Sequence, residues 1–444
     1  MAHSHAPERR TFLKLSARLA ALGMTGLGLG ATRTFFEQNV HAAAATDYKA
    51  LVCIYLFGGN DSNNMIVPVD PARYAAYQTA RGTLVLPAAR LLAPIADAQQ
   101  RPYALHSSMS AINAAFGTGR VAFVLNMGPL NRPLTRAEYQ AGGNAPQNLF
   151  SHSDQTLQAQ AGISTTVRSG WGGRLLDAFQ IADNLAAVSV SSPALFLDGE
   201  MSRGNVVPPQ ANLQLSAMTP ANRAAVEAML QVNGGNPMRE AANRVFLDGL
   251  LLGDRLASAE RLPPLATPFP ATSLGNQLRE VSRLIRLRAE RGPGRQVFFC
   301  SVGGFDTHAA QDGTHTNLLQ QLSDAMAAFF YATVEIGLAN HVTTFTQSEF
   351  SRTMQTNGTG TDHAWGGHQI VIGGAVRGGI YGEMPTFALA GPDDANTRGV
   401  WIPKIATSQF GSTLGRWFGA SPSELTWAFP NLPLFGTYDL GFMA

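Results

Sequence analysis

Seven side chains in this sequence belong to the types that hold metal ions in proteins, and six of them fall in its C-terminal third. They are Asp61, Asp306, His308, Glu349, Asp362, His363 and His368. Imidazoles and carboxylates are the ligands that zinc, manganese and iron take from proteins. The sequence therefore predicts a metal site, and hydrolysis is the chemistry we expect of it.

The most specific part of the pattern is the stretch T-D-H-A-W-G-G-H. It places Asp362, His363 and His368 within seven residues and separates the last two with Gly366 and Gly367. Glycines permit a tight fold-back of the backbone. We therefore expect His368 to approach the same point as Asp362.

The other candidate ligands each have a structural alternative. In G-G-F-D-T-H, Asp306 and His308 are alternate residues, which in an extended segment point the same way, but they also fit an Asx turn with a surface histidine. Asp61 follows two glycines and fits either a ligand or a turn bonded to its own backbone. Glu349 precedes Arg352, so a Glu–Arg surface pair is its alternative. We expect His315, further downstream, to be exposed to solvent.

A nucleophile is harder to place. Ser151 lies in N-L-F-S-H-S-D, where a helix could begin with Ser151 or Ser153 as its N-cap. A hydroxyl at a helix N-terminus beside a metal could be deprotonated and attack phosphorus. A plain cap is the alternative, and His152 and Asp154 are further candidate ligands.

The elements that must position these side chains alternate between strands and helices. Strand-like apolar runs occupy residues 51–57, 121–125, 186–190, 297–302, 342–346 and 369–372, and helix-like segments occupy 221–232, 239–261, 274–291 and 316–336. This alternation predicts a largely parallel sheet covered by helices on both faces. In such sheets, ligands lie beyond the ends of the strands, where several candidate residues fall.

The N-terminus predicts export. Arg9 and Arg10 precede a weakly apolar stretch at 15–31 and the small-residue run 42–45. This arrangement is typical of a twin-arginine signal, here residues 1–45, read by the twin-arginine translocase. A basic amphipathic helix or membrane anchor is the alternative. We expect residues 46–444 to form one periplasmic or extracellular domain, with a cap insertion around 191–220.

Composition narrows the function further. The formal net charge is +2 with no basic stripe, which argues against a nucleic-acid binder. Beyond the export signal no apolar run is long enough to span a bilayer. Cys53 and Cys300 lie in strand-like runs and are expected to be buried free thiols rather than a disulfide.

Several motifs together resemble a known family. R-R-T-F-L-K, L-F-G-G-N-D-S-N-N, G-W-G-G-R-L-L-D, G-G-F-D-T-H and T-D-H-A-W-G-G-H-Q-I-V-I-G-G occur in the order seen in the domain-of-unknown-function family 1501. These are mostly exported bacterial proteins, and the family looks like a branch of the alkaline phosphatase and sulfatase superfamily. The resemblance implies a three-layer α/β/α sandwich with typically two metal ions.

The resemblance also implies roles for individual residues. Asp61 would be the first-strand ligand, Asp306 with His308 the middle pair, and Ser151 the nucleophile. Glu349 falls where the superfamily carries its Asp-His pair, and Asp362, His363 and His368 fall where its late histidine lies; alternatively, Asp362 and His363 are the pair. The pattern departs from the superfamily because Asp306 and His308 are only two apart, and the sulfatase signature is missing around both cysteines.

The function expected from these observations is an exported metal-dependent hydrolase of phosphate-type esters. One or two divalent cations, zinc first and manganese or calcium as alternatives, would hold the ester oxygen. Ser151 would attack, and Arg352 or Arg377 would offer a guanidinium to the transferring group. The alternatives are an exported binding or assembly protein with a structural metal, and a hydrolase of sulfate or carbohydrate esters.

Overall fold

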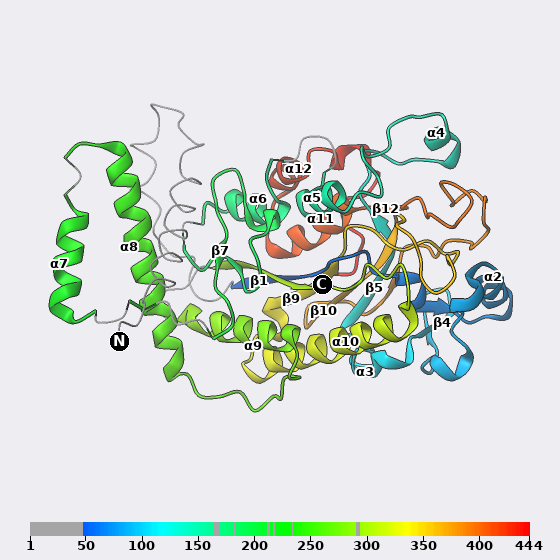
Figure 1. Cartoon of the computed structure of the whole chain (residues 1–444), viewed down its shortest axis with the longest axis horizontal. Coiled ribbons are helices and arrows are strands. Elements are labelled where there is room, and N and C mark those ends of the chain that lie inside the picture. The colour runs from blue at the N-terminus through cyan, green and yellow to red at the C-terminus, as the bar shows by residue number, and fades with distance from the viewer. Residues whose placement is uncertain are drawn as a thin grey trace, which may run out of the picture. The chain divides into compact units, whose positions relative to one another are not determined.

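The computed structural model describes residues 48–444, except 164–167, 182, 211–213, 216–217, 233 and 290–293. The chain divides into two compact units (Figure 1). The described residues of one lie within 48–210 and 263–444, and those of the other lie within 214–262. The candidate ligands lie in the first unit. The predicted signal segment lies outside the described residues.

The first unit is built on a mixed, mostly parallel sheet. Among the described residues, nine strands form it in the order β11-β5-β10-β9-β1-β8-β6-β7, with β12 paired to β5. The strands are β1 (Lys49–Leu56), β5 (Val121–Gly128), β6 (Ala187–Ser189), β7 (Asn205–Val206), β8 (Arg295–Val302), β9 (Val342–Gln347), β10 (Gly367–Gly373), β11 (Gly379–Tyr381) and β12 (Ile405–Ala406). Among the described strand pairs of this sheet, β10 is antiparallel to both of its neighbours, β5 and β9, and the other pairs are parallel.

Helices cover both faces of this sheet (Figure 1). One face carries α5 (His152–Ala161), α6 (Trp171–Ala178), α11 (Thr407–Phe418) and α12 (Pro422–Ala428), and the other carries α3 (Ser110–Phe116), α9 (Ser273–Arg286) and α10 (Gln311–Glu335). The architecture is therefore the three-layer α/β/α sandwich that the sequence predicted. The helices α2 (Pro71–Arg81) and α4 (Arg136–Gln140) lie outside these layers in the view.

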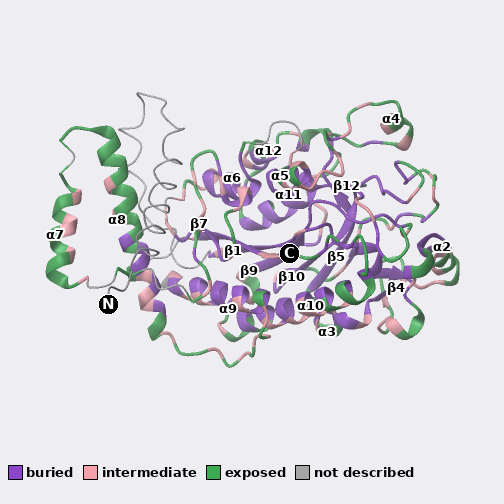
Figure 2. Cartoon of the chain, viewed as in Figure 1, coloured by how far each residue is buried: buried purple, intermediate pink, exposed green. Residues whose placement is uncertain are grey.

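Hydrophobic patterning in the sequence predicted the central strands best. β1 is buried along nearly its whole length, as expected for an apolar run covered on both faces. Figure 2 shows the sheet and the helix sides that face it as buried. All six predicted strands and all four predicted helices are present, with ends that differ by a few residues.

Shorter elements escaped prediction. A second sheet joins β2 (Ile66–Pro68), β4 (Pro102–Leu105) and β3 (Ile95–Ala96) in antiparallel pairs. These strands have two to four residues each. Runs that short do not show a period from which a strand could be recognised.

Two expectations from composition concern the thiols and the membrane. Cys53 and Cys300 are both buried and free, on the neighbouring strands β1 and β8, which confirms the prediction. Among the described helices, none combines the length and the apolar character needed to cross a bilayer.

The second unit contains two helices in its described part. α7 (Pro220–Leu230) and α8 (Pro237–Ser258) contact each other, and Arg223 Nη2 of α7 lies 2.9 Å from Asp254 Oδ2 of α8. The segment 191–210 belongs to the first unit, where it contains β7. The prediction of one domain with a cap insertion around 191–220 stays a prediction.

The turn after β1 depends on a glycine. Gly58 has φ +114°, a left-handed conformation, and a Cβ atom there would lie 2.2 Å from the backbone nitrogen of Asp306. Only glycine allows both the conformation and the close approach. The loop after β8 therefore packs directly on the loop after β1.

Replacing Gly58 tests this packing. Gly58→Ala is expected to lower the free energy of unfolding by about 2 kcal/mol or more, because it adds backbone strain and a steric clash. Urea unfolding followed by circular dichroism would measure the change. Gly303→Ala is the matched control in the same loop region, since its Cβ would meet no heavy atom within 4 Å. Equal stability of both variants would contradict the close packing of the loop after β8 against Gly58.

Candidate metal centre

Three adjacent strands supply the candidate metal centre from their carboxyl ends. β9, β1 and β8 are neighbours in the sheet, and the loops that follow them carry Glu349, Gly58 and Asp306. The N-terminus of α5 and the loop between β9 and β10 complete the site. The location agrees with the expectation that ligands lie beyond the ends of parallel strands.

Four nitrogen atoms converge on one oxygen, Oδ1 of Asp306. The distances are 2.8 Å from Arg352 Nη1, 3.0 Å from His308 Nε2, 3.3 Å from His363 Nε2 and 3.5 Å from His152 Nε2. The Nε2 atoms of His308 and His363 lie 3.0 Å apart. Three imidazoles and a carboxylate from distant parts of the chain therefore face a common point.

The opposite ring nitrogens of these histidines are each held by an oxygen. The Nδ1 contacts are His152 to Glu349 Oε1 at 2.9 Å, His308 to Asp362 Oδ1 at 3.2 Å, and His363 to the Phe150 carbonyl at 2.8 Å. An oxygen that accepts from Nδ1–H leaves the lone pair on Nε2, which is how proteins orient histidine ligands. The three lone pairs would then point toward the same space.

This donor set fits a divalent cation. Ligands bound tetrahedrally at about 2.0–2.1 Å lie about 3.3 Å from one another. The separations among Asp306 Oδ1, His308 Nε2 and His363 Nε2 are 3.0 to 3.3 Å. The ligand atoms of His152, Asp306 and His363 also lie within 4.8 Å of one another. Two facing lone pairs at 3.0 Å would repel unless a cation or a proton lay between them.

Arg352 is a buried support for Asp306. Its guanidinium is inaccessible to solvent and also donates to the carbonyl oxygens of Gly58, at 3.2 Å, and Thr361. Partial burial by itself would raise the pKa of Asp306. The hydrogen bond and the charge of Arg352 outweigh that effect and hold the pKa below its usual value. Asp306 is thus kept ionised.

Glu349 and Asp362, the outer carboxylates that contact Nδ1 of His152 and of His308, differ in their surroundings. Glu349 is buried and accepts from the Gly58 amide at 2.8 Å as well as from His152. Asp362 is half-exposed and pairs with Arg398 at 2.6 Å. Burial would raise the pKa of Asp362, but hydrogen bonds from Asn357, Arg398 and His308 lower it to about 2. Glu349 is not the surface Glu–Arg pair that its sequence context allowed.

Ser151 caps α5. Its Oγ accepts from the Asp154 amide at 3.3 Å, donates to Asp154 Oδ2 at 2.5 Å and lies 3.1 Å from Ser153 Oγ. This is the N-cap that the sequence offered as the alternative to a nucleophile. The cap also aims His152, the first residue of the helix, at Asp306.

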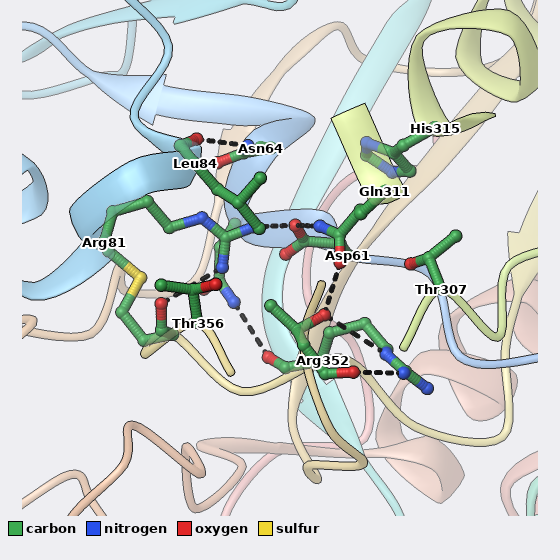
Figure 3. Close-up of polar contacts among 12 residues, drawn as sticks. Asp61, Asn64, Arg81, Leu84, Thr307, Gln311, His315, Arg352 and Thr356 are labelled. Atoms are coloured by element: carbon green, nitrogen blue, oxygen red, sulfur yellow. Dashed lines mark hydrogen bonds and ion pairs between the residues drawn. The ribbon is translucent and has the colours of Figure 1, made fainter. Parts of the chain in front are cut away.

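Asp61 lies in a buried network that reaches Arg352 (Figure 3). Its carboxylate pairs with Arg81 and accepts from Gln311, and neither charged side chain is exposed. Gln311 in turn accepts from Thr361 Oγ1 at 2.5 Å, and Thr361 Oγ1 lies 3.3 Å from Arg352 Nε. Asp61 is thus joined to Asp306 through a chain of side chains. Its Oδ2 contacts Arg81 and Gln311 rather than the three histidines, and its Oδ1 is buried without a hydrogen-bond partner among the described residues.

Two further histidines lie inside the protein. His368, on β10, is buried, and its Nδ1 accepts from the Asn126 amide at 2.9 Å. It does not take part in the cluster around Asp306. His315, on α10, is also buried and lies 3.0 Å from Asn60 Oδ1, so the expectation of solvent exposure was wrong. The face of α10 that packs on the β1 loop explains its burial.

The centre is open to solvent. Asp306 is 46% exposed, and His308 is 45% exposed. A shallow hollow of about 580 Å³ adjoins it, lined by Phe57, Gly58, His152, Ser153, Thr156, Leu157, Asp306 and Glu349. A small molecule could therefore reach the cluster.

Arg377 lies away from this opening. It follows β10, whose carboxyl end pairs with the beginning of β5, because these strands are antiparallel. Its amide donates to the Phe442 carbonyl there. The structure therefore places Arg377 at the opposite end of the sheet, where it cannot serve the transferring group as the sequence suggested.

The fold and site define an α/β protein with a histidine–carboxylate centre at the carboxyl ends of its central strands. The chain belongs to the family described as Protein of unknown function (DUF1501), which matches residues 48–398. The match includes every candidate ligand. A comparison with curated proteins gives no match.

Solved structures resemble the chain only distantly. Ps i-CgsB in complex with k-i-k-neocarrahexaose is 9% identical and covers 88% of this chain and 75% of its own, with a TM-score of 0.36. A putative sulfatase from Bacteroides thetaiotaomicron is 10% identical and covers 86% of this chain and 75% of its own, with a TM-score of 0.32. A mutant of the TAB5 alkaline phosphatase is 8% identical and covers 86% of this chain and 97% of its own, with a TM-score of 0.30. Scores this low carry no conclusion about function.

Some site residues were not identified from the sequence. His152 was only a further candidate, although its place after a helix cap was a usable signal. Phe350 stacks on His363 with ring centres 4.7 Å apart, and Arg398 holds Asp362. Neither contact can be predicted from the spacing of these residues along the sequence.

The outer carboxylates should control metal affinity. Glu349→Gln and Asp362→Asn are each expected to weaken zinc binding about 10- to 100-fold, because each removes the charge that orients one imidazole. Isothermal titration of the metal-free protein would measure the dissociation constants. Glu383→Gln, at an exposed carboxylate after β11, is the control and should bind like the parent. Unchanged affinity in all three variants would exclude the assigned orientation roles.

The two buried histidines should make the protein sensitive to acid. Burial lowers the pKa of both His315 and His368 from 6.5 to about 3. Between these values the unfolded chain takes up protons that the folded chain does not, so the free energy of unfolding falls as pH drops below about 6.5. Each histidine contributes a slope of up to about 1.4 kcal/mol per pH unit.

A variant can isolate this contribution. In His368→Asn the amide oxygen can still accept from Asn126, but no proton is taken up, so the slope between pH 6 and pH 4 should be shallower. Urea unfolding at a series of pH values, with a chelator present to exclude effects of metal loss, would measure it. A slope equal to that of the parent would show that His368 does not carry the effect.

Proposed function

We propose that this chain is an exported, metal-dependent hydrolase of phosphate-type esters. The observation that supports the proposal is the convergence of three imidazole Nε2 atoms on Asp306 Oδ1, each with its Nδ1 held by an oxygen. Export to the periplasm or beyond is supported by the paired Arg9 and Arg10 ahead of a weakly apolar stretch.

The residues proposed to hold the metal are His152, His308, His363 and Asp306. Three histidines with one carboxylate suit zinc best, with manganese as the alternative, because imidazole is a poor ligand for calcium. When bound, a divalent cation would polarise an ester oxygen as a Lewis acid and make a water more acidic. Asp61 and His368 have no part in this proposal, because Asp61 pairs with Arg81, His368 Nδ1 accepts from the Asn126 amide, and neither is found in contact with Asp306 or the three histidines in the described structure.

Charge supports an anionic substrate. Counted with ionised carboxylates and neutral histidines, the site holds the carboxylates of Asp154, Asp306, Glu349 and Asp362 and the guanidiniums of Arg352 and Arg398, a formal charge of −2. One divalent cation offsets that charge. The cation would attract an anionic ester oxygen more strongly than a neutral one.

Two further residues, Arg352 and Phe350, would hold the proposed ligands in position. Arg352 is buried and keeps Asp306 ionised and in place, so it is a positioning residue in this proposal rather than a clamp on the ester. Phe350 packs against the rings of His152 and His363, with ring centres 4.8 and 4.7 Å apart, and limits their rotation. These contacts preorganise the imidazoles.

Ser151 is the proposed nucleophile. It adjoins His152 at the N-terminus of α5, where the amides favour a developing negative charge. The Ser151 oxygen would bond to phosphorus as the bond from phosphorus to the leaving oxygen breaks, and the serine proton would pass to Asp154 Oδ2, which already accepts from Ser151 at 2.5 Å, and on to the leaving oxygen. Water would then cleave the phosphoserine and restore the hydroxyl. Hydrogen bonds from Ser151 and Asn148 lower the pKa of Asp154, so this carboxylate is a weak base. Direct attack by water is the alternative that the experiment must separate.

Asp306 and Ser151 should therefore behave differently on mutation. Asp306→Ala is expected to lose both bound metal and turnover of aryl phosphate esters, by about 10³-fold or more, since it removes a ligand. Ser151→Ala should keep its metal and lose turnover by a similar factor if the serine attacks. Elemental mass spectrometry and release of para-nitrophenol would measure these.

The controls distinguish the remaining possibilities. His341→Ala, at a partly buried histidine that contacts the Tyr48 carbonyl, should retain both metal and turnover. Full turnover in Ser151→Ala would assign the attack to water. A parent protein that binds metal, loses stability without it and hydrolyses no ester would support the binding or assembly protein instead.

A further inference from the structure

The hollow beside the candidate metal centre has an apolar wall. Phe57, at the end of β1, is partly buried and packs on Tyr55 with ring centres 4.6 Å apart. Leu157 on α5 is 45% exposed, and Thr156 lies beside it. An apolar wall next to a polar cluster suits a molecule with one apolar part and one reacting polar group.

The same hollow lacks cationic side chains in the described part of the protein. Its charged lining groups are Asp306 and Glu349, and its lining contains no lysine or arginine. The nearby guanidinium of Arg352 is buried, with its donors directed to other groups. The guanidinium of Arg398 is paired with Asp362. Sites that hold a doubly charged phosphate usually present free arginine or lysine donors to it.

The charge balance favours a single negative charge on the substrate. With one divalent cation the site, with the proposed base Asp154 included, carries no net formal charge, so the cation is the group that would face a single negative charge on the ester. A second negative charge would lie near Asp306 and Glu349 without a partner. Like charges in a partly buried site repel one another, which disfavours a dianion there.

We propose that the substrate is a phosphodiester-type monoanion with an apolar aryl or alkyl group, and that the apolar group lies against Phe57 and Leu157. This inference rests on the proposed function and specifies its substrate class. It distinguishes the diester from a phosphate monoester, which carries two charges near neutral pH.

The net reaction is hydrolysis. A new bond forms between phosphorus and the oxygen of water, the bond from phosphorus to the leaving oxygen breaks, and a proton from the water ends on the leaving alcohol or phenol. No electron transfer occurs. The product is a phosphate monoester, whose second ionisation would place a further charge near Asp306 and Glu349, and this repulsion would favour its release.

The test compares three esters with the same leaving group on the zinc-loaded mature protein. They are bis(para-nitrophenyl) phosphate, methyl para-nitrophenyl phosphate and para-nitrophenyl phosphate, and kcat/KM for each is divided by its uncatalysed rate. The aryl diester is expected to exceed the monoester by about 100-fold. It should exceed the methyl diester by about 10-fold, through the area buried against the apolar wall.

Two outcomes would overturn the inference in different ways. Metal-dependent turnover that favours the monoester would reject the substrate class and leave the proposed function standing. Absence of metal-dependent turnover on all three esters would reject the proposed function, and the substrate class with it.

A specificity switch tests the location. Leu157→Arg adds the missing cation to the hollow, so the ratio of monoester to diester kcat/KM should rise about 10-fold or more, while metal content stays unchanged. Val334→Arg, at a residue of α10 that is 50% exposed and near the helix end farthest from the site, is the matched control and should keep the parent ratio. An unchanged ratio in Leu157→Arg, in a protein that folds and binds zinc, would overturn the placement.

A smaller change tests the apolar wall alone. Leu157→Ala should raise KM for the aryl diester by about 3-fold or more and leave KM for the methyl diester unchanged, because only the larger group reaches that side chain. Equal changes for both diesters would overturn the proposed contact.

Discussion

The contact between Asp306 and the buried guanidinium of Arg352 fixes the point around which the candidate centre is arranged. The two groups are 2.8 Å apart, and Arg352 is itself held by carbonyl oxygens of the loops after β1 and β9. An arginine with no exposed surface needs partners for its donors, and the removal of one partner would leave a buried charge without compensation. The position of Asp306 is therefore tied to the loops of two neighbouring strands.

This dependence explains how segments far apart in sequence form one site. The loops after β1 and β8 touch at Gly58 and Asp306, and the loop after β9 bends back so that Arg352 and His363 form an isolated antiparallel bridge. Gly360 allows the same loop to pass His308, whose backbone would lie 2.2 Å from a Cβ atom at that position. Gly58 and Gly360 thus serve close backbone contacts between the loops.

More of the fold than of the candidate site could be predicted from the sequence. Long apolar runs such as that of β1 report burial on both faces, and the alternation of elements implies the layers. Asp306, His308 and His363 could be selected by residue type and loop position. Asp61 has the same local signature, yet its partner is Arg81, which lies on a helix twenty residues later and is chosen by tertiary packing. His368 sits within β10, where its ring is buried beside β5, so nearness in sequence to His363 did not bring the rings together.

The arrangement also balances two opposing electrostatic demands. A guanidinium next to Asp306 keeps that carboxylate ionised, but its positive charge opposes binding of a cation at the same oxygen. Glu349 and Asp362 offset this repulsion from the far side of the imidazoles, since each adds a negative charge through a hydrogen bond to Nδ1. A carboxylate in that position makes the imidazole a stronger ligand and fixes its orientation. In the proposed metal-bound state, the affinity for the cation would therefore be set jointly by the group that holds Asp306 and by the two carboxylates that hold the histidines.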